Sequence, residues 1–105
     1  MKPEISIIRD TWVKAVQPEK IILFGSHARG EAELNSDLDF WVVWHNPSMQ
    51  NNRDKAVYLR RLLPRDVHIP MDLIVMTPEQ YQDAMSDPRT FTSLISREGK
   101  VIYAS

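Results

Sequence analysis

Two aspartates, Asp37 and Asp39, stand one residue apart at the head of the apolar run "DLDFWVVW". In a β-strand alternate side chains share a face, so these two carboxylates are expected to point the same way. Adjacent carboxylates repel each other, and burial increases the penalty, whereas a divalent cation between them reverses it. Magnesium takes a few carboxylate oxygens together with waters and substrate phosphates. The pair therefore predicts a magnesium site where a buried strand begins.

A third acid, Asp72, is the charged residue within the apolar stretch "IPMDLIVM". If this stretch forms a strand beside 37–44, its carboxylate can converge on the same place. Three acids can hold two metal ions, roughly 3.5–4 Å apart, which clamp the attacking and leaving oxygens of a phosphoryl displacement. Taken alone, Asp72 fits an ordinary buried or edge acid equally well.

A glycine and a serine, Gly25 and Ser26, break the apolar run "KIILFG" upstream of the aspartates. A glycine at a strand end lets the backbone approach a ligand closely, and a following helical turn offers free N–H groups to phosphate. The Ser26 hydroxyl can bond a terminal phosphate oxygen, and Arg29 lies within reach of the same charge. This pattern predicts a phosphate-binding turn.

Strands alternate with helices along the chain. The pattern predicts an amphipathic helix over 3–17, which Pro18 ends, and a helix over roughly 50–63. Thr77-Pro78-Glu79-Gln80 is a capping box that opens a helix to about Met85, and a further helix follows Asp87-Pro88 with Phe91, Leu94 and Ile95 inward. Strands are expected over 20–25, 37–44, from near Met71, and over 100–103, with a helical turn at the start of 26–33. The predicted fold is α+β, a small mixed sheet flanked by helices.

Composition sets limits on what the chain can be. It has 105 residues, of which 43% are apolar, so residues 1–105 are expected to form a single domain with one core. Thirteen basic and 14 acidic residues give a net charge of -1, which argues against coating of nucleic acid. Cysteine is absent, the N-terminus lacks a signal-peptide pattern, and the longest apolar stretch is too short to cross a bilayer. We expect a cytoplasmic protein without a membrane segment.

The motif "GSHARG…SDLDFWVV", with a lone aspartate on a later strand, resembles the polymerase-beta-type nucleotidyltransferases and most closely their minimal members. The resemblance implies transfer of a nucleoside monophosphate from an NTP, usually ATP, to a hydroxyl. It implies that Gly25 and Ser26 bind the triphosphate and that Asp37 and Asp39 hold two magnesium ions. Asp72 would ligate the metal nearer the acceptor and help to deprotonate the attacking hydroxyl. His27 is a departure, because the commonest form of the family motif has arginine there.

The resemblance also suggests an acceptor. Larger relatives carry additional domains that grip their substrates, so here another chain or a dimer mate is expected to present the hydroxyl. Minimal nucleotidyltransferases are typically the antitoxins of HEPN ribonuclease toxins, which implies AMP transfer to a toxin tyrosine. A module that neutralises its partner by contact alone is the alternative. Transfer to a small molecule or an RNA end is a third reading, against which the missing substrate domain and the near-neutral charge argue.

Other chemistry-bearing residues have simpler interpretations. The histidines His27, His45 and His68 form no zinc-ligand pattern. The three tryptophans are expected in the core, although Trp44 at a strand end could lie at an interface. A basic group forms either a solvated helix face or a docking surface for an acidic partner or acceptor, and it consists of Arg53, Lys55, Arg60, Arg61 and Arg65.

Overall fold

Strands and helices alternate in the computed structural model, which describes residues 2–30, 37–67 and 69–105 without the side chains of Ser26 and Arg29. The elements, in chain order, are α1 (Pro3–Val16), β1 (Lys20–Phe24), α2 (Ser26–Arg29), β2 (Leu38–Val43), α3 (Asn52–Arg61), β3 (Met71–Met76), α4 (Pro78–Met85), α5 (Phe91–Glu98) and β4 (Lys100–Ala104). Each predicted helix and strand is present. No helix in this described part of the chain is both long and apolar enough to cross a bilayer.

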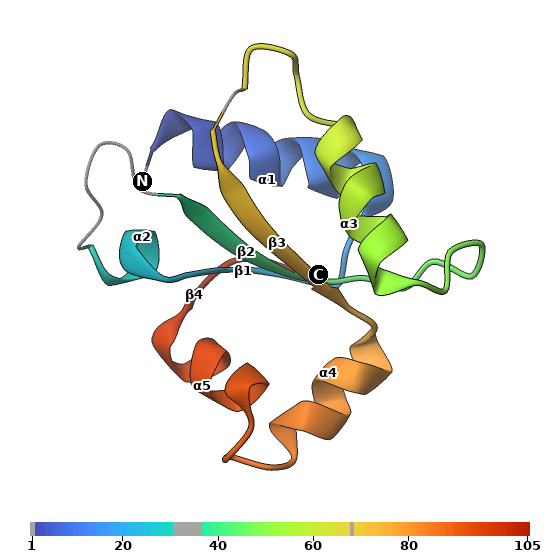
Figure 1. The fold of residues 1–105 in the computed structure, drawn as a ribbon, viewed down its shortest axis with the longest axis vertical. Coiled ribbons are helices and arrows are strands. Elements are labelled where there is room, and N and C mark those ends of the chain that lie inside the picture. The colour runs from blue at the N-terminus through green and yellow to red at the C-terminus, as the bar shows by residue number, and fades with distance from the viewer. Residues whose placement is uncertain (1, 31–36, 68) are drawn as a thin grey trace.

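The strands form one mixed sheet in the order β3-β2-β1-β4. β1 runs antiparallel to both β2 and β4, whereas β2 and β3 are parallel and are joined through α3. In Figure 1, α1 and α3 lie on one side of the sheet and α4 and α5 on the other, while α2 lies at the end of β1. This arrangement confirms the predicted α+β class.

The face covered by α1 and α3 holds the larger part of the core. Leu38, Phe40 and Val42 of β2 point to this side and are fully buried. Trp12 of α1 packs edge-on against Phe40, with ring centroids 5.2 Å apart, and its Nε1 donates a hydrogen bond to the carbonyl oxygen of Leu59 at 2.9 Å. A buried indole whose N–H is satisfied contributes its full apolar area to stability. We call this layer the closed face.

The opposite face of the sheet is covered by α4 and α5 over part of its length. Trp41 and Val43 of β2 pack there against Ile22, Tyr81 and Ile95 in a smaller cluster. The alternation of β2 therefore divides its side chains between two layers, as the sequence predicts. We call this second layer the open face, because its apolar cluster covers only the part of β2 beyond Asp39.

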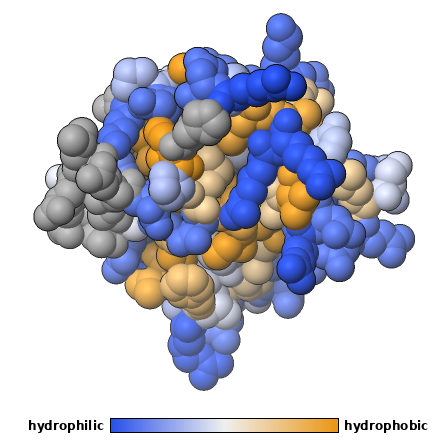
Figure 2. Space-filling view, turned by 45° about the horizontal axis from the view of Figure 1, so that its top comes forward, coloured by the Kyte–Doolittle hydropathy of each residue, from blue (hydrophilic) through white to orange (hydrophobic). Residues whose placement is uncertain are grey.

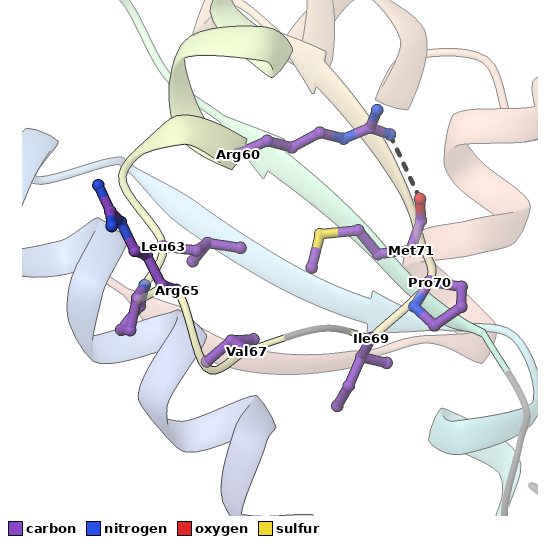
Figure 3. A pocket seen from close by; sticks show the side chains of 8 residues that line it. Arg60, Leu63, Arg65, Val67, Ile69, Pro70 and Met71 are labelled. Atoms are coloured by element: carbon purple, nitrogen blue, oxygen red, sulfur yellow. Dashed lines mark hydrogen bonds between the residues drawn. The ribbon is translucent and has the colours of Figure 1, made fainter.

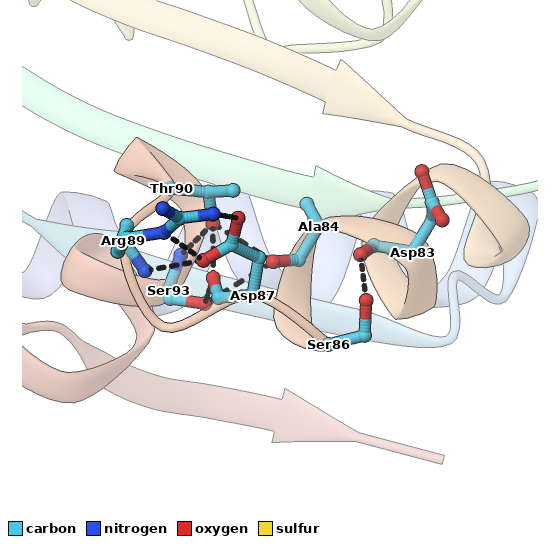
Figure 4. Close-up of polar contacts among 7 residues, drawn as sticks. All are labelled: Asp83, Ala84, Ser86, Asp87, Arg89, Thr90 and Ser93. Atoms are coloured by element: carbon cyan, nitrogen blue, oxygen red, sulfur yellow. Dashed lines mark hydrogen bonds and ion pairs between the residues drawn. The ribbon is translucent and has the colours of Figure 1, made fainter.

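Polar bonds hold the connection between α4 and α5 (Figure 4). The capping box predicted at Thr77 is present and begins α4. At the other end of α4, Thr90 Oγ1 donates to the carbonyl oxygen of Ala84 at 2.8 Å, and Ser93 Oγ donates to that of Asp87 at 2.8 Å. The same two carbonyl groups also accept backbone N–H bonds from Asp87 and Thr90, so hydroxyl and backbone donors together fix the turn.

The prediction that Phe91 and Leu94 point inward is wrong. Their exposed fractions are 59% and 39%, whereas Ile95, also predicted to face inward, is buried. The helix begins at Phe91 behind the N-cap Thr90, and Ser93 is turned into the protein by its hydrogen bonds. Side-chain hydroxyls that replace backbone partners therefore fix the rotation of α5, which hydrophobic periodicity alone did not reveal.

The basic group of α3 is not uniformly solvated. Lys55 has an exposed fraction of 1% and lies on the same side of the helix as the buried Leu59. Burial lowers the pKa of Lys55, and its Nζ donates one long hydrogen bond, 3.5 Å, to Asn52 Oδ1. The arginines of the group are exposed. Lys55 is therefore corrected from a surface residue to a buried one.

Candidate functional site

The predicted acids Asp39 and Asp72 are brought together by strand pairing. In the parallel register of β2 and β3 they lie directly opposite each other, and Phe24 of β1 lies opposite Asp39 on the other side. Neighbouring strands are about 4.8 Å apart, and residues in register point to the same face. The condition for convergence of the third acid, that its strand lies beside 37–44, is thus fulfilled. Asp39 is half-buried and Asp72 is exposed.

The charges of neighbouring residues change the pKa of Asp39. The pKa of Asp39 is raised above its usual range, mainly because burial disfavours its charged form. The negative charge of Asp72, a hydrogen bond with the Asp72 side chain and the charge of Asp37 raise it further, while His27 acts in the opposite direction. All three neighbours are therefore close enough to act on the Asp39 carboxylate. A cation bound among these acids would remove the repulsion that raises this pKa.

Gly25 makes room for the Asp39 carboxylate. Its φ of 74° lies in the left-handed region, and a Cβ at this position would collide with Asp39 Oδ2. The sequence assigned this glycine to close approach of a ligand, whereas the group that approaches it in the structure is the carboxylate of the site itself. The chain then enters α2. The side chains of Ser26 and Arg29 lie outside the described residues, so their predicted phosphate contacts stay predictions.

The donor chemistry of the site fits magnesium. Among the described residues, no three His, Asp or Glu side chains already form a closed metal-binding group. Magnesium does not require one, because it is usually held by one or two carboxylates together with waters and substrate phosphates. Asp39 and Asp72 provide such a pair, and the exposed Asp37 comes directly before β2. The assignment of two ions to three acids stays a prediction.

An aromatic row beside the acids was not recognised as part of the site from the sequence. Trp41 lies on the same face as Asp39, with its ring 6.0 Å from Phe24 and 6.1 Å from Phe91 between centroids. Its buried Nε1 has no hydrogen-bond acceptor among the described residues. Strand alternation placed Trp41 on the face of the acids, but the unpaired donor depends on tertiary packing, for which the sequence has no signal.

Comparison with known proteins identifies the family. The family model described as the nucleotidyltransferase domain matches residues 5–95, which include every element from most of α1 to the middle of α5. The chain belongs to this family. A search of curated protein sequences gives no significant match.

Two solved structures share the fold. A proposed nucleotidyltransferase from Sulfolobus solfataricus aligns with a TM-score of 0.61 and 17% identity, covering 96% of this chain and 83% of that one. A chain from a structure described as a toxin–antitoxin with AMP-PNP aligns with a TM-score of 0.51 and 20% identity, covering 99% of this chain and 75% of that one. At these identities the likeness establishes the arrangement of the sheet and helices, and the family rests on the sequence match.

Proposed function

We propose that this nucleotidyltransferase domain transfers AMP from magnesium-ATP to a hydroxyl group of a partner protein. The observation that carries the proposal is the register of β2 and β3, which sets Asp39 opposite Asp72 on the face where burial and like charge raise the pKa of Asp39. A structural core has no use for two such carboxylates side by side, because their repulsion destabilises it. A metal-dependent transfer from a phosphate-bearing substrate uses both.

The reaction requires a bond between the acceptor oxygen and the α-phosphorus, with cleavage of the bond from that phosphorus to the bridging oxygen. Pyrophosphate leaves, and the hydroxyl proton goes to a base. Asp37 and Asp39 would hold magnesium, which stabilises the charge that develops on the phosphate oxygens. Asp72 would share the metal nearer the acceptor and take up the hydroxyl proton. Gly25 keeps the Asp39 carboxylate in place by leaving space for it.

The nucleotide contacts are assigned to the turn after β1. Gly25, Ser26 and Arg29 would hold the triphosphate, with His27 where the related motif has arginine. His27 is half-buried and lowers the pKa of Asp39, so a positive charge on its ring would act on the same carboxylate. We therefore assign to His27 part of the electrostatic role that arginine has in that motif.

The acceptor in this proposal is a tyrosine of a HEPN toxin, and the chain is its cytoplasmic antitoxin. The structural neighbour supports this assignment, since a chain with the same fold occurs in a structure described as a toxin–antitoxin with AMP-PNP, an ATP analogue. The motif resemblance supports it independently. Hetero-oligomer formation with the toxin follows from the assignment.

Label transfer tests the proposal. The purified chain is mixed with magnesium, ATP labelled at the α-phosphate and either the protein encoded beside it or a cell lysate. We expect a labelled protein band with the wild type, and its loss in an Asp37→Asn/Asp39→Asn variant by about 1,000-fold or more, because several kcal/mol of transition-state stabilisation disappear. Asp83→Asn, an exposed acid on α4, is the matched control and should retain transfer.

Two results would contradict the proposal. Equal labelling by the double variant would show that the acids are not the catalytic groups. Absence of label under conditions where the partner binds, with full neutralisation of that partner by the double variant, would show that the domain acts by contact alone.

A further inference from the structure

The strand β3 has a free edge. It lies at the end of the sheet, and within the described chain its pairing partner is β2. The carbonyl oxygens of Pro70 and Met76 accept hydrogen bonds from the N–H groups of Leu38 and Trp44, at 3.0 and 2.9 Å. Backbone groups of alternate residues point to opposite sides of a strand. The even-numbered residues of β3 therefore face β2, and the odd-numbered ones turn their N–H and C=O groups outward.

The outward groups belong to Met71, Leu73 and Val75. The carbonyl oxygen of Met71 accepts a hydrogen bond from Arg60 Nη2 at 3.3 Å, which confirms its outward direction (Figure 3). For Leu73 and Val75 the described chain provides no second strand. An unpaired edge of this kind is a template for strand addition by another polypeptide.

A groove runs along this edge between β3 and α3. One hollow of about 440 Å³ is lined by Arg53, Val57 and Arg60 of α3 and by Leu73 and Val75 of β3. A second hollow, of about 450 Å³, continues from Arg60 past Arg65 to Met71 (Figure 3). Figure 2 shows apolar side chains between hydrophilic ones on the side of the molecule that carries α1 and α3. Arg60 lies between the two hollows and lines both of them, and we call the two hollows together the groove.

The charges of the groove have one sign. Arg53, Arg60 and Arg65 are exposed, and the described residues that line the two hollows include no acid. Arginine binds carboxylates through two parallel N–H groups, and Val57, which is 40% exposed, offers an apolar contact between the arginines. In an added strand alternate side chains share a face, so a peptide with an acid at every second position can turn all of its carboxylates toward the arginines of α3 while its backbone pairs with the edge.

A second copy of the chain matches the groove less well. If two β3 edges paired antiparallel, the α3 helices of both copies would lie on the same face of the joined sheet. Arg53 and Arg60 of one copy would then stand near the same arginines of the other, and like charges at an interface disfavour association.

We propose that the groove between α3 and the outer edge of β3 binds an extended, acidic segment of a partner protein by strand addition. The inference does not depend on the proposed transfer reaction. Leu73 and Val75 direct their side chains to the closed face, whereas Asp72 belongs to the opposite one, so variants in the groove leave the acids untouched. The basic group noted in the sequence is thereby divided: Arg53, Arg60 and Arg65 line the groove, and Lys55 and Arg61 do not.

The test is a titration of the whole, isotope-labelled chain with three octapeptides, followed by amide NMR signals. Alternating Glu-Val is the probe, Lys-Val reverses its charge, and Glu-Pro keeps the charge but lacks every second N–H group and is held by its prolines in a conformation unsuited to strand pairing. We expect Glu-Val to shift and protect the Leu73 and Val75 amides, and both other peptides to bind at least about tenfold more weakly. Arg53→Glu/Arg60→Glu should weaken Glu-Val binding by a similar factor.

The control is Arg61→Glu, which changes the same charge on the same helix outside the groove and should bind Glu-Val like the wild type. If Arg53→Glu/Arg60→Glu does not fold, Arg53→Gln/Arg60→Gln provides the same comparison with smaller changes. The proposal is overturned if Glu-Val leaves the Leu73 and Val75 amides unchanged, in which case the arginines merely protect an edge. Equal binding of Lys-Val, preference for a single-stranded oligothymidine, or concentration-dependent shifts without peptide would also overturn it.

Discussion

The two faces of the sheet are built from the same strands but differ in what they leave unsatisfied. On the closed face Trp12 is fully buried and its indole N–H is hydrogen-bonded. On the open face Trp41 is also buried, but its indole N–H has no acceptor among the described residues, and Asp39 has a raised pKa. Unsatisfied donors and repelling carboxylates lower stability. Apart from Lys55 on α3, these groups lie on the open face, which indicates that stability comes mainly from the closed one.

This difference explains how a chain of 105 residues can hold the candidate site beside a stable core. A small domain buries little apolar surface, so it tolerates few destabilising groups. The alternation of β2 separates the residues that stabilise the core from those of the candidate site within a single strand. Leu38, Phe40 and Val42 point to the closed face, and Asp39 and Trp41 point to the open one. The comparison can be tested by making the same substitution on each face.

The largest expected difference concerns buried isoleucines. Ile8→Ala on the closed face removes a side chain that is fully buried, and we expect it to lower the free energy of unfolding by about 3–5 kcal/mol. Ile95→Ala on the open face should lower the free energy of unfolding by about 2–3 kcal/mol. Ile95 belongs to a smaller cluster, in which neighbouring side chains can move into the cavity that the substitution leaves. Urea unfolding followed by circular dichroism measures both. Equal losses would show that the two faces contribute equally to stability.

A glycine pair tests the geometry of the site itself. Gly25 and Gly30 have nearly the same positive φ, 74° and 72°, but a Cβ collides with Asp39 at Gly25 and meets nothing within 4 Å at Gly30. Alanine at either position should cost about 1–2 kcal/mol of stability through backbone strain. Gly25→Ala should in addition lower label transfer by about 100-fold, since it displaces Asp39, the carboxylate to which the proposed function assigns a magnesium ion.

Gly30→Ala is thus the matched control for Gly25→Ala. Its transfer rate should equal that of the wild type at temperatures where both are folded. A similar loss of transfer in both variants would mean that the turn after β1, rather than the space for the carboxylate, sets the activity.

A third comparison uses the two indoles. Trp12→Phe removes a hydrogen bond, whereas Trp41→Phe removes a buried donor that has no partner in the described chain. Both variants lose a similar volume, so we expect Trp12→Phe to be less stable than Trp41→Phe by about 1–3 kcal/mol. Thermal unfolding by calorimetry checks the difference. Equal destabilisation would indicate that the Trp41 N–H finds an acceptor in solution.

Much of the fold followed from the sequence because its signals are local. Alternation in "DLDFWVVW" predicted which residues of β2 share a face, and the box at Thr77 predicted the start of α4. The pairing of Asp39 with Asp72 was a conditional prediction, since the order of strands depends on the packing of the whole chain. The structure fulfils that condition.

What the sequence did not reveal depends on contacts between distant residues. The exposure of Phe91 follows from hydroxyl bonds between α5 and the end of α4, which hydrophobic periodicity does not contain. The reason for Gly25 is a carboxylate from another strand. Lysine generally prefers the surface, so residue type alone predicted that Lys55 is exposed, whereas the structure buries it.

The smallest expected effect concerns this buried lysine, which lies on α3 next to the closed face. Because burial lowers the pKa of Lys55, the unfolded chain binds its proton more strongly than the folded chain does. Between the lowered pKa and the unfolded value, about 10.4, the unfolded state carries more protons, so the contribution of Lys55 to stability rises with pH. Below that window the penalty of burying the charged form is constant.

Lys55→Met removes the titrating group and keeps a long side chain that can fill the same space. The variant should therefore be more stable than the wild type at pH 7, and its advantage should shrink as the pH approaches 10. Urea unfolding of both proteins at pH 7, 8, 9 and 9.5 measures this, and taking the difference cancels the titration of the tyrosines and of the other lysines. An advantage that stays constant with pH would mean that Lys55 keeps its usual pKa, with its ammonium group hydrated through the cavity that it lines together with His45 and Thr77.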